Sequence, residues 1–207
     1  MKAIGASLFI CFFASVLAQG ASASEAFERS KFPARAKREA FTRSCEFDRK
    51  GVLLEEQGKA AEAVIEFRKA IEAYPSYAVP HSNLGNALSD LHKYSEAVLH
   101  YQKAVELAPD FAAAYCNMAD ALTKQKNYTA AEMACNKALR VDPGYVPAMT
   151  NLAEVYLETN RPSEARAVLI GATGLATTAG LKKIIQEDLA KAKKMLDVQN
   201  GSGVSLK

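Results

Sequence analysis

The 207-residue sequence has no tryptophan, only three histidines and four cysteines, and no strong excess of either charge. Its formal net charge of +3 is too small to give the basic face on which nucleic-acid binding depends. The three histidines, His81, His92 and His100, show no H-E-x-x-H or comparable metal-ligand spacing. We therefore expect no nucleic-acid partner, no metal site and no cofactor.

Sequence signatures of catalysis are missing as well. The chain has no G-x-S-x-G motif, no phosphate-binding glycine loop and no EF-hand. Neighbouring carboxylates such as Glu154 and Glu158 have no sequence context that would separate their pKa values, as acid–base catalysis requires. We expect a protein that is not an enzyme.

The first 23 residues differ from the rest of the chain. A short apolar run follows Lys2 and ends in the small residues 21–23, which is the order of a secretory signal with an A-x-A cleavage site. We predict that residues 1–23 are a signal peptide, so that the protein is exported, either periplasmic or secreted. A retained membrane anchor is the alternative, for which the run is marginally short. Cleavage would remove Lys2 and leave 25 basic and 23 acidic residues, a net charge of +2, with no stable membrane span.

Residues 24–43 are rich in arginine and lysine, diluted by Glu28 and Glu39. We interpret them as a basic, solvated helical lead-in, with an anionic-lipid or polyanion patch as the alternative. The cysteines that remain after cleavage are Cys45, Cys116 and Cys135. An odd number without a C-x-x-C motif does not favour a disulfide framework. Cys135 stands at a position that is apolar in the other repeats, whereas Cys116 is expected on an inner face where it could be exposed.

From Ser44 onward the sequence divides without gaps into four blocks of 34 residues, namely 44–77, 78–111, 112–145 and 146–179. The eighth position of each block is small: Gly51, Gly85, Ala119 and Ala153. The twentieth is always alanine: Ala63, Ala97, Ala131 and Ala165. Two helices approach closely only where their facing residues are small, so these positions predict where the helices of a pair cross. A proline then ends the second helix in the first three blocks: Pro75, Pro109 and Pro143.

These offsets resemble the tetratricopeptide-repeat family over Ser44 to about Ala179. The resemblance implies an all-α fold, a right-handed superhelical solenoid of about four helix-turn-helix repeats. The fourth block matches less well: Pro162 starts its second helix, and Gly171 and Gly174 are expected to cut that helix short.

The segment 180–198 leaves the repeat pattern but keeps an apolar stripe at helical spacing: Leu181, Ile184, Ile185, Leu189, Ala192 and Leu196. The last repeat of an array would otherwise expose its stacking face, so we predict a capping helix. A partner-binding helix is the alternative. Residues 199–207 are small and polar and are expected to form a disordered tail.

In the tetratricopeptide family the first helix of each repeat lines a concave groove. At its sixth position this chain has Asn83, Asn117 and Asn151, which resemble an asparagine ladder that holds an extended peptide by its backbone. The alternative is that asparagine is simply common at that position in the family. The ladder and the ninth-position residues together give the candidate peptide-binding residues: Asn83, Asn86, Asn117, Asp120, Asn151 and Glu154.

The expected groove is acidic. Its positions hold Asp48, Glu55, Glu56, Asp90, Asp120, Glu154 and Glu158 against Arg49 and Lys124. It lacks the lysine and arginine with which related domains grip a C-terminal carboxylate, so we do not expect it to bind chaperone tails. We predict an exported, non-catalytic scaffold for neutral or basic peptide or protein segments. The alternatives are an assembly subunit of a cell-envelope complex that uses its convex face or ends, and an accessory protein of a carbohydrate-modifying system.

Overall fold

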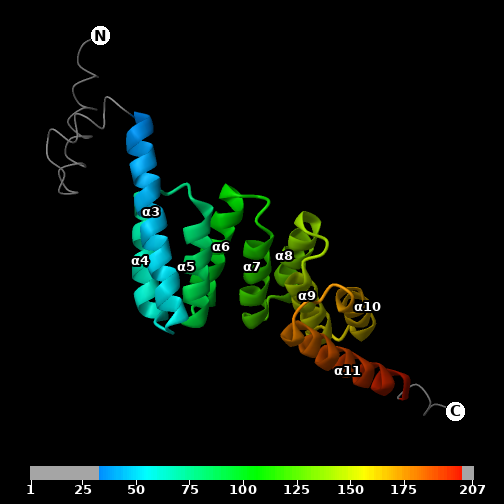
Figure 1. Cartoon of the computed structure of the whole chain (residues 1–207). Coiled ribbons are helices and arrows are strands. Elements are labelled where there is room, and N and C mark those ends of the chain that lie inside the picture. The colour runs from blue at the N-terminus through cyan, green and yellow to red at the C-terminus, as the bar shows by residue number, and fades with distance from the viewer. Residues whose placement is uncertain (1–32, 202–207) are drawn as a thin grey trace, which may run out of the picture.

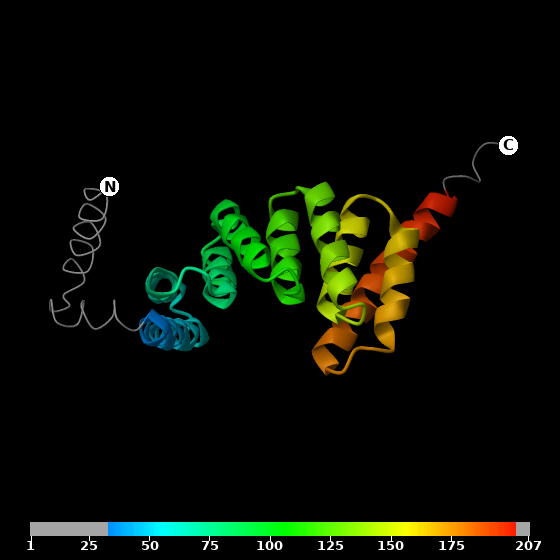
Figure 2. The same ribbon diagram turned by 90° about the horizontal axis from the view of Figure 1, so that it is seen from above.

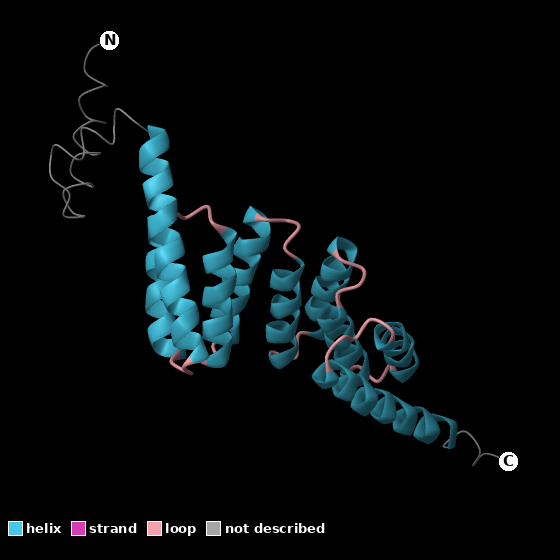
Figure 3. Ribbon diagram, in the orientation of Figure 1, coloured by secondary structure: helices cyan, strands magenta, loops and turns pink. Residues whose placement is uncertain are grey.

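The computed structural model describes residues 33–201, so the predicted signal peptide and the last six residues lie outside the described part. The described residues form nine helices and no strand (Figures 1 and 3), as expected for an all-α protein. They are α3 Pro33–Glu56, α4 Ala60–Ala73, α5 Ala78–Asp90, α6 Tyr94–Leu107, α7 Ala112–Lys124, α8 Tyr128–Val141, α9 Val146–Glu158, α10 Pro162–Thr173 and α11 Ala179–Gly201. No helix within residues 33–201 is both long enough and apolar enough to cross a membrane.

The helices stack pairwise in a solenoid, α3 with α4, α5 with α6, α7 with α8 and α9 with α10 (Figure 2). The first helices α3, α5 and α7 each contact the first helix of the next pair, which is α5, α7 and α9 respectively. Within residues 33–201 the backbones of the second helices α4, α6, α8 and α10 do not pack against one another, although the Arg68 side chain of α4 reaches Glu96 of α6 at 4.0 Å. Elements on the inside of a curved stack are closer together, so α3, α5, α7 and α9 form its concave side. We call this side the inner surface.

The small positions lie where the two helices of a pair cross, as predicted. A β-carbon built on Gly51 would clash with the ring of Phe67, and one on Gly85 would lie 2.5 Å from Cε1 of Tyr101. At the other side of the crossing, all four alanines are 0 % exposed: Ala63, Ala97, Ala131 and Ala165. The close approach lets the aromatic rings fill the space between helices that a larger residue at the crossing would occupy.

The turn from first to second helix has the same backbone in every repeat. One residue per turn adopts a left-handed conformation, with φ between 59° and 73°: Gly58, His92, Lys126 and Asn160. The next residue then donates its N–H to a carbonyl five residues earlier, as Lys93 does to Leu88 at 2.8 Å. This bonding is that of a Schellman helix end, in which main-chain groups satisfy the last carbonyls of the helix.

The helix α11 packs on α9 and α10 at the C-terminal end of the stack (Figure 1). Its Ile185 and Ala192 are buried in a cluster with apolar residues of the fourth repeat. Residues 199–201, predicted as the start of a disordered tail, form the last turn of α11 instead. In α10, Gly174 is the C-cap as expected, whereas Gly171 lies inside the helix and does not end it.

Two of the three described cysteines are deeply buried. Cys135 is 0 % exposed, as predicted for an apolar packing residue. The expectation that Cys116 could be exposed is wrong: it is 3 % exposed and packs with Ala138 of α8 and Ala148 of α9. Burial raises the pKa of both thiols to about 12, so both are protonated and unreactive at neutral pH.

Candidate functional site

The asparagines of the predicted ladder lie in a row along the inner surface, Asn83 on α5, Asn117 on α7 and Asn151 on α9. Each donates its side-chain N–H to the preceding first helix. The acceptors are Asp48 Oδ1 at 2.9 Å, Asn86 Oδ1 at 2.9 Å and the Cys116 carbonyl at 3.2 Å. The ladder therefore connects neighbouring repeats, a structural role that the spacing alone did not reveal.

The amides keep part of their hydrogen-bonding capacity, since each carries a second N–H and an oxygen. Asn86 differs from the ladder residues because its Oδ1 accepts from both Asn117 and the Tyr101 hydroxyl, each at 2.9 Å. Its oxygen is thus committed to hydrogen bonds within its own repeat and to the next repeat. Peptide binding by Asn83, Asn117 and Asn151 stays a prediction.

The two acidic candidates, Asp120 on α7 and Glu154 on α9, share one cation. Lys124 Nζ lies 3.6 Å from Asp120 Oδ1 and 3.9 Å from Glu154 Oε1. Burial raises the pKa of Glu154 above its usual range although Lys124 opposes the shift. Further along, Lys191 of α11 lies 3.1 Å from Glu158. These contacts reduce the negative charge of this half of the inner surface.

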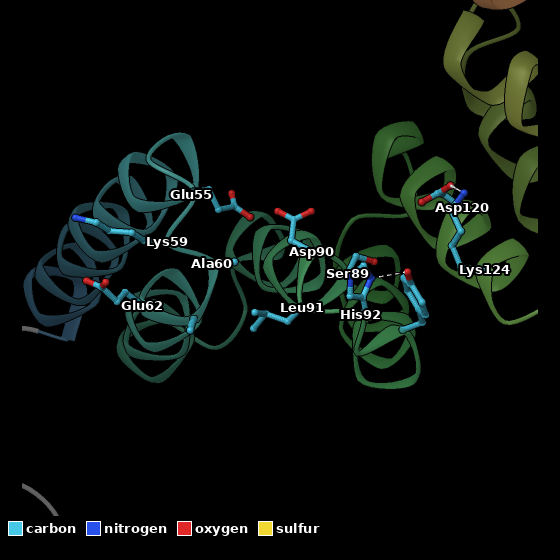
Figure 4. A pocket seen from close by; sticks show the side chains of 13 residues that line it. Glu55, Lys59, Ala60, Glu62, Ser89, Asp90, Leu91, His92, Asp120 and Lys124 are labelled. Carbon is cyan, nitrogen blue, oxygen red and sulfur yellow. Dashed lines mark hydrogen bonds and ion pairs between the residues drawn. The ribbon is translucent and has the colours of Figure 1, made fainter.

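The carboxyl groups without a basic partner lie at the first two repeats instead, namely Asp48 and Glu55 of α3 and Asp90 of α5. None of the three has an ion-pair partner among residues 33–201. The carboxylates of Glu55 and Asp90 project from the same side of their helices (Figure 4), and the two interact electrostatically. Burial, and then the charges of Asp90 and Asp48, raise the pKa of Glu55 to about 7.

The Glu55 carboxylate has a further unusual property. Its Oε1 is shielded from solvent and accepts no hydrogen bond from any described residue. A buried charged oxygen without a donor is unfavourable, so a cationic donor placed there would stabilise the ionised carboxylate.

An open pocket of about 690 Å³ lies beside these carboxylates, where the first helices end (Figure 4). Its walls come from the ends of α3 and α5, the turns that follow them, the starts of α4 and α6, and the C-terminal part of α7. The charged residues among its lining are Glu55, Lys59, Glu62, Asp90, Asp120 and Lys124. Glu55 and Asp90 are among the groove positions expected from the sequence but not among the candidate residues, which stand at the sixth and ninth positions of the repeat.

The carboxylates that line this pocket are suited to binding positively charged groups. Within the described part of the chain, no three His, Cys, Asp or Glu side chains are placed to hold a metal ion. Carboxylates that converge on an open pocket are suited to pair with ammonium or guanidinium groups.

Four models of the tetratricopeptide repeat match the sequence, at residues 47–77, 78–111, 100–133 and 122–177. Together they span residues 47–177, more than half of the chain. The chain is therefore a tetratricopeptide-repeat protein.

Solved structures share this fold. Pseudomonas aeruginosa PilF is 22 % identical over 78 % of this chain and 75 % of its own, with a TM-score of 0.65. The TPR2B domain of yeast Sti1, solved in complex with pHsp70, is 25 % identical over 56 % of this chain and 96 % of its own, with a TM-score of 0.54. The first tetratricopeptide domain of Spaghetti (RPAP3), bound to an HSP90 peptide, is 23 % identical over 57 % and 94 %, with a TM-score of 0.56. No curated protein matches the sequence at a significant level.

Proposed function

We propose that this protein is an exported, non-catalytic scaffold whose inner surface binds extended protein segments, with a preference for neutral or basic ones. The observation that carries the proposal is the group of carboxylates Asp48, Glu55 and Asp90, which face the inner surface without a basic partner in the described part. A lysine or arginine of a ligand would supply the missing charge. A concave surface of one sign also focuses the field and attracts the opposite charge.

The structural neighbours support peptide binding but suggest a different ligand charge. Sti1 and RPAP3 domains of this fold were solved with chaperone partners, and the RPAP3 ligand SRMEEVD carries three acidic residues. The first two repeats of the present chain would repel such a segment, because their inner surface is itself acidic. The shared fold and the acidic inner surface together favour a scaffold of the same architecture whose ligands carry the opposite charge to SRMEEVD.

Peptide binding can be tested by fluorescence anisotropy with two labelled peptides of equal length, one rich in lysine and arginine and one in glutamate. We expect the basic peptide to bind more tightly and to lose affinity as ionic strength rises from about 0.01 M to about 0.15 M, since the Debye length falls from about 30 Å to about 8 Å. Preferential binding of the acidic peptide would overturn the proposal.

Substitutions locate the site. Replacing Glu55 by Gln and Asp90 by Asn together should weaken basic-peptide binding by about tenfold, the effect of about 1.4 kcal/mol. Asp120→Asn and Glu154→Gln should each have a smaller effect, because both carboxylates already face Lys124. The matched control is Glu106→Gln on the outer helix α6, where the carboxylate is 64 % exposed and paired with Lys103. Equal losses for the control and the Glu55 and Asp90 variants would place binding elsewhere.

Export rests on the sequence of residues 1–23. Mass spectrometry of the protein recovered from its native host should show a mature chain that begins at Ser24. A chain that retains residues 1–23 would favour the anchored alternative.

A second candidate function, assembly into a larger complex through the convex face, has one observation in its favour. Ile65 of α4, Leu99 of α6 and Met133 of α8 occupy the same repeat position and are 55 %, 65 % and 61 % exposed. Exposed apolar residues in a row are typical of protein interfaces. Leu99→Asp should abolish recovery of such a complex from native extracts and leave peptide binding unchanged, whereas the Glu55 and Asp90 variants should do the reverse.

A further inference from the structure

Two histidines are stacked at the junction between the first and second repeats. The rings of His81 on α5 and His100 on α6 lie 5.9 Å apart between centroids, with their planes 28° apart. His81 is 7 % exposed, and its Nε2 lies 3.2 Å from the carbonyl oxygen of Pro75, in the turn that joins α4 to α5. This one pair therefore connects α5, α6 and the turn between two repeats.

The hydrogen bond defines the tautomer of His81. A carbonyl oxygen can only accept, so Nε2 carries the proton and Nδ1 of the neutral ring does not. Nδ1 is buried and has no hydrogen-bond partner among the described residues. Protonation would add an N–H there without an acceptor, and a buried donor without an acceptor is strongly unfavourable.

The charges around the pair also oppose protonation. Lys103 of α6 faces His81, and Arg68 of α4 faces His100, where Glu96 of α6 is the one opposing carboxylate. Burial is the main cause that lowers the pKa of both imidazoles, and the charge of a protonated His81 lowers the pKa of His100 further. The Pro75 carbonyl and Glu96 act in the other direction but do not reverse the shift.

We propose that His81 and His100 make the junction between the first two repeats sensitive to protons, so that mild acid loosens the contact of α5 and α6 with the turn at Pro75. The junction itself is independent of the peptide-binding function proposed above.

The direction of the stability change follows from proton linkage. A histidine whose pKa is lowered on folding binds fewer protons in the folded state, so its contribution to stability is complete above the unfolded pKa of about 6.5 and declines as pH falls below it. Glu55 and Asp48, with raised pKa values, change stability in the opposite sense. The test therefore compares variants rather than the native protein alone.

The variant His81→Gln/His100→Phe keeps an N–H donor for Pro75 and an aromatic ring in the stack but cannot titrate. Between pH 7.5 and pH 5.5, we expect the native protein to lose at least about 2–4 °C in Tm relative to this variant. His92→Gln, at an exposed histidine, is the control and should follow the native protein. Equal pH dependence in the native protein and the double variant would overturn the proposal.

If the double variant does not fold, two measurements on the native protein test whether the junction is sensitive to protons. NMR of its three histidines should give titration midpoints for His81 and His100 below that of histidine in a short peptide. Hydrogen exchange, corrected for the intrinsic effect of pH, should show faster exchange at the start of α5 at pH 5.5 than at pH 7.5. Ordinary midpoints, or unchanged protection at α5, would each refute a proton-sensitive junction.

Discussion

The ring of Tyr101 occupies the space into which a side chain at Gly85 would project. A β-carbon on Gly85 would lie 2.5 Å from Cε1 of that ring, closer than real β-carbons approach their neighbours. The ring is 2 % exposed, and its hydroxyl donates to Asn86, so it cannot turn aside without losing this partly buried hydrogen bond. The α5–α6 crossing therefore depends on glycine at this position.

Replacing Gly85 by leucine should force α5 and α6 apart and lower the free energy of unfolding by about 1–3 kcal/mol or more. Gly171→Ala is the control, because it lies inside α10 and a β-carbon there would meet no atom within 4 Å. This control should leave stability unchanged or raise it by up to about 1 kcal/mol, since alanine favours helix over glycine. Thermal unfolding followed by circular dichroism measures both. Coincident melts for Gly85→Leu and the native protein would contradict the crossing.

Two adjacent isoleucines of α11 should respond very differently to the same change. Ile185 is 1 % exposed, whereas Ile184 is 45 % exposed. Ile185→Asp should destabilise the fourth repeat by about 3 kcal/mol or more through a buried unpaired charge, and Ile184→Asp by well under 1 kcal/mol. Urea unfolding gives both values.

Truncation after Gly180 removes the capping helix as a whole. It should expose the apolar end of the fourth repeat and cause association, because an uncapped repeat end is poorly soluble. Sedimentation of the truncated chain tests this. A truncated chain that remains monomeric, with undiminished helicity per residue, would argue against a capping role.

The raised pKa of Glu55 gives a pH dependence of known sign. Its ordinary value is near 4.5 and its folded value is about 7, so the folded state binds the extra proton. The stability from this proton is complete below about pH 4.5 and is lost as pH rises through 7. Glu55→Gln should therefore be more stable than the native protein at pH 8 by on the order of 1 kcal/mol, reduced by solvent screening, and nearly equal to it at pH 4.5. Urea unfolding at the two pH values checks this, and an unchanged difference between them would contradict it.

The left-handed turns predict opposite effects for two substitutions. Lys126 adopts φ 60° and Gly58 adopts φ 73°. Lys126→Gly should raise the free energy of unfolding by up to about 1 kcal/mol by removing the strain of a β-carbon, partly offset by the greater freedom of glycine when unfolded. Gly58→Ala should lower it by about 1 kcal/mol. Two shifts of the same sign in denaturant midpoint would contradict this assignment.

The helices and their crossings could be predicted from sequence because repeated positions report packing between consecutive elements. The expected block starts Ala78, Ala112 and Val146 are the first residues of α5, α7 and α9. In the first repeat, α3 begins earlier, at Pro33, because the helical lead-in continues into it without a break.

The contacts of the inner surface could not be predicted in the same way. Asn117 bonds to Asn86 and Asn151 to Cys116, and such pairs depend on the rotation between repeats, which a single repeat's pattern does not contain. Lys191 reaches Glu158 from a helix outside the repeats. Counting the charges at groove positions in the sequence omitted Lys191, so it overstated the negative charge near Asp120 and Glu154.

The left-handed turns have a consequence for how this protein can diversify. Main-chain groups close each turn, so the helix end does not depend on the side chain at its centre, although His92 contacts Tyr94 and Asn160 accepts a hydrogen bond from Gln199 of α11. The positions Gly58, His92, Lys126 and Asn160 hold four chemically different residues, all exposed, and the first two line the pocket. They form a row of exchangeable positions, one per repeat, along the rim of the pocket and beyond it. Substitutions at these four positions, in evolution or in a designed library, can change which ligand the protein prefers while the helices and their packing stay the same.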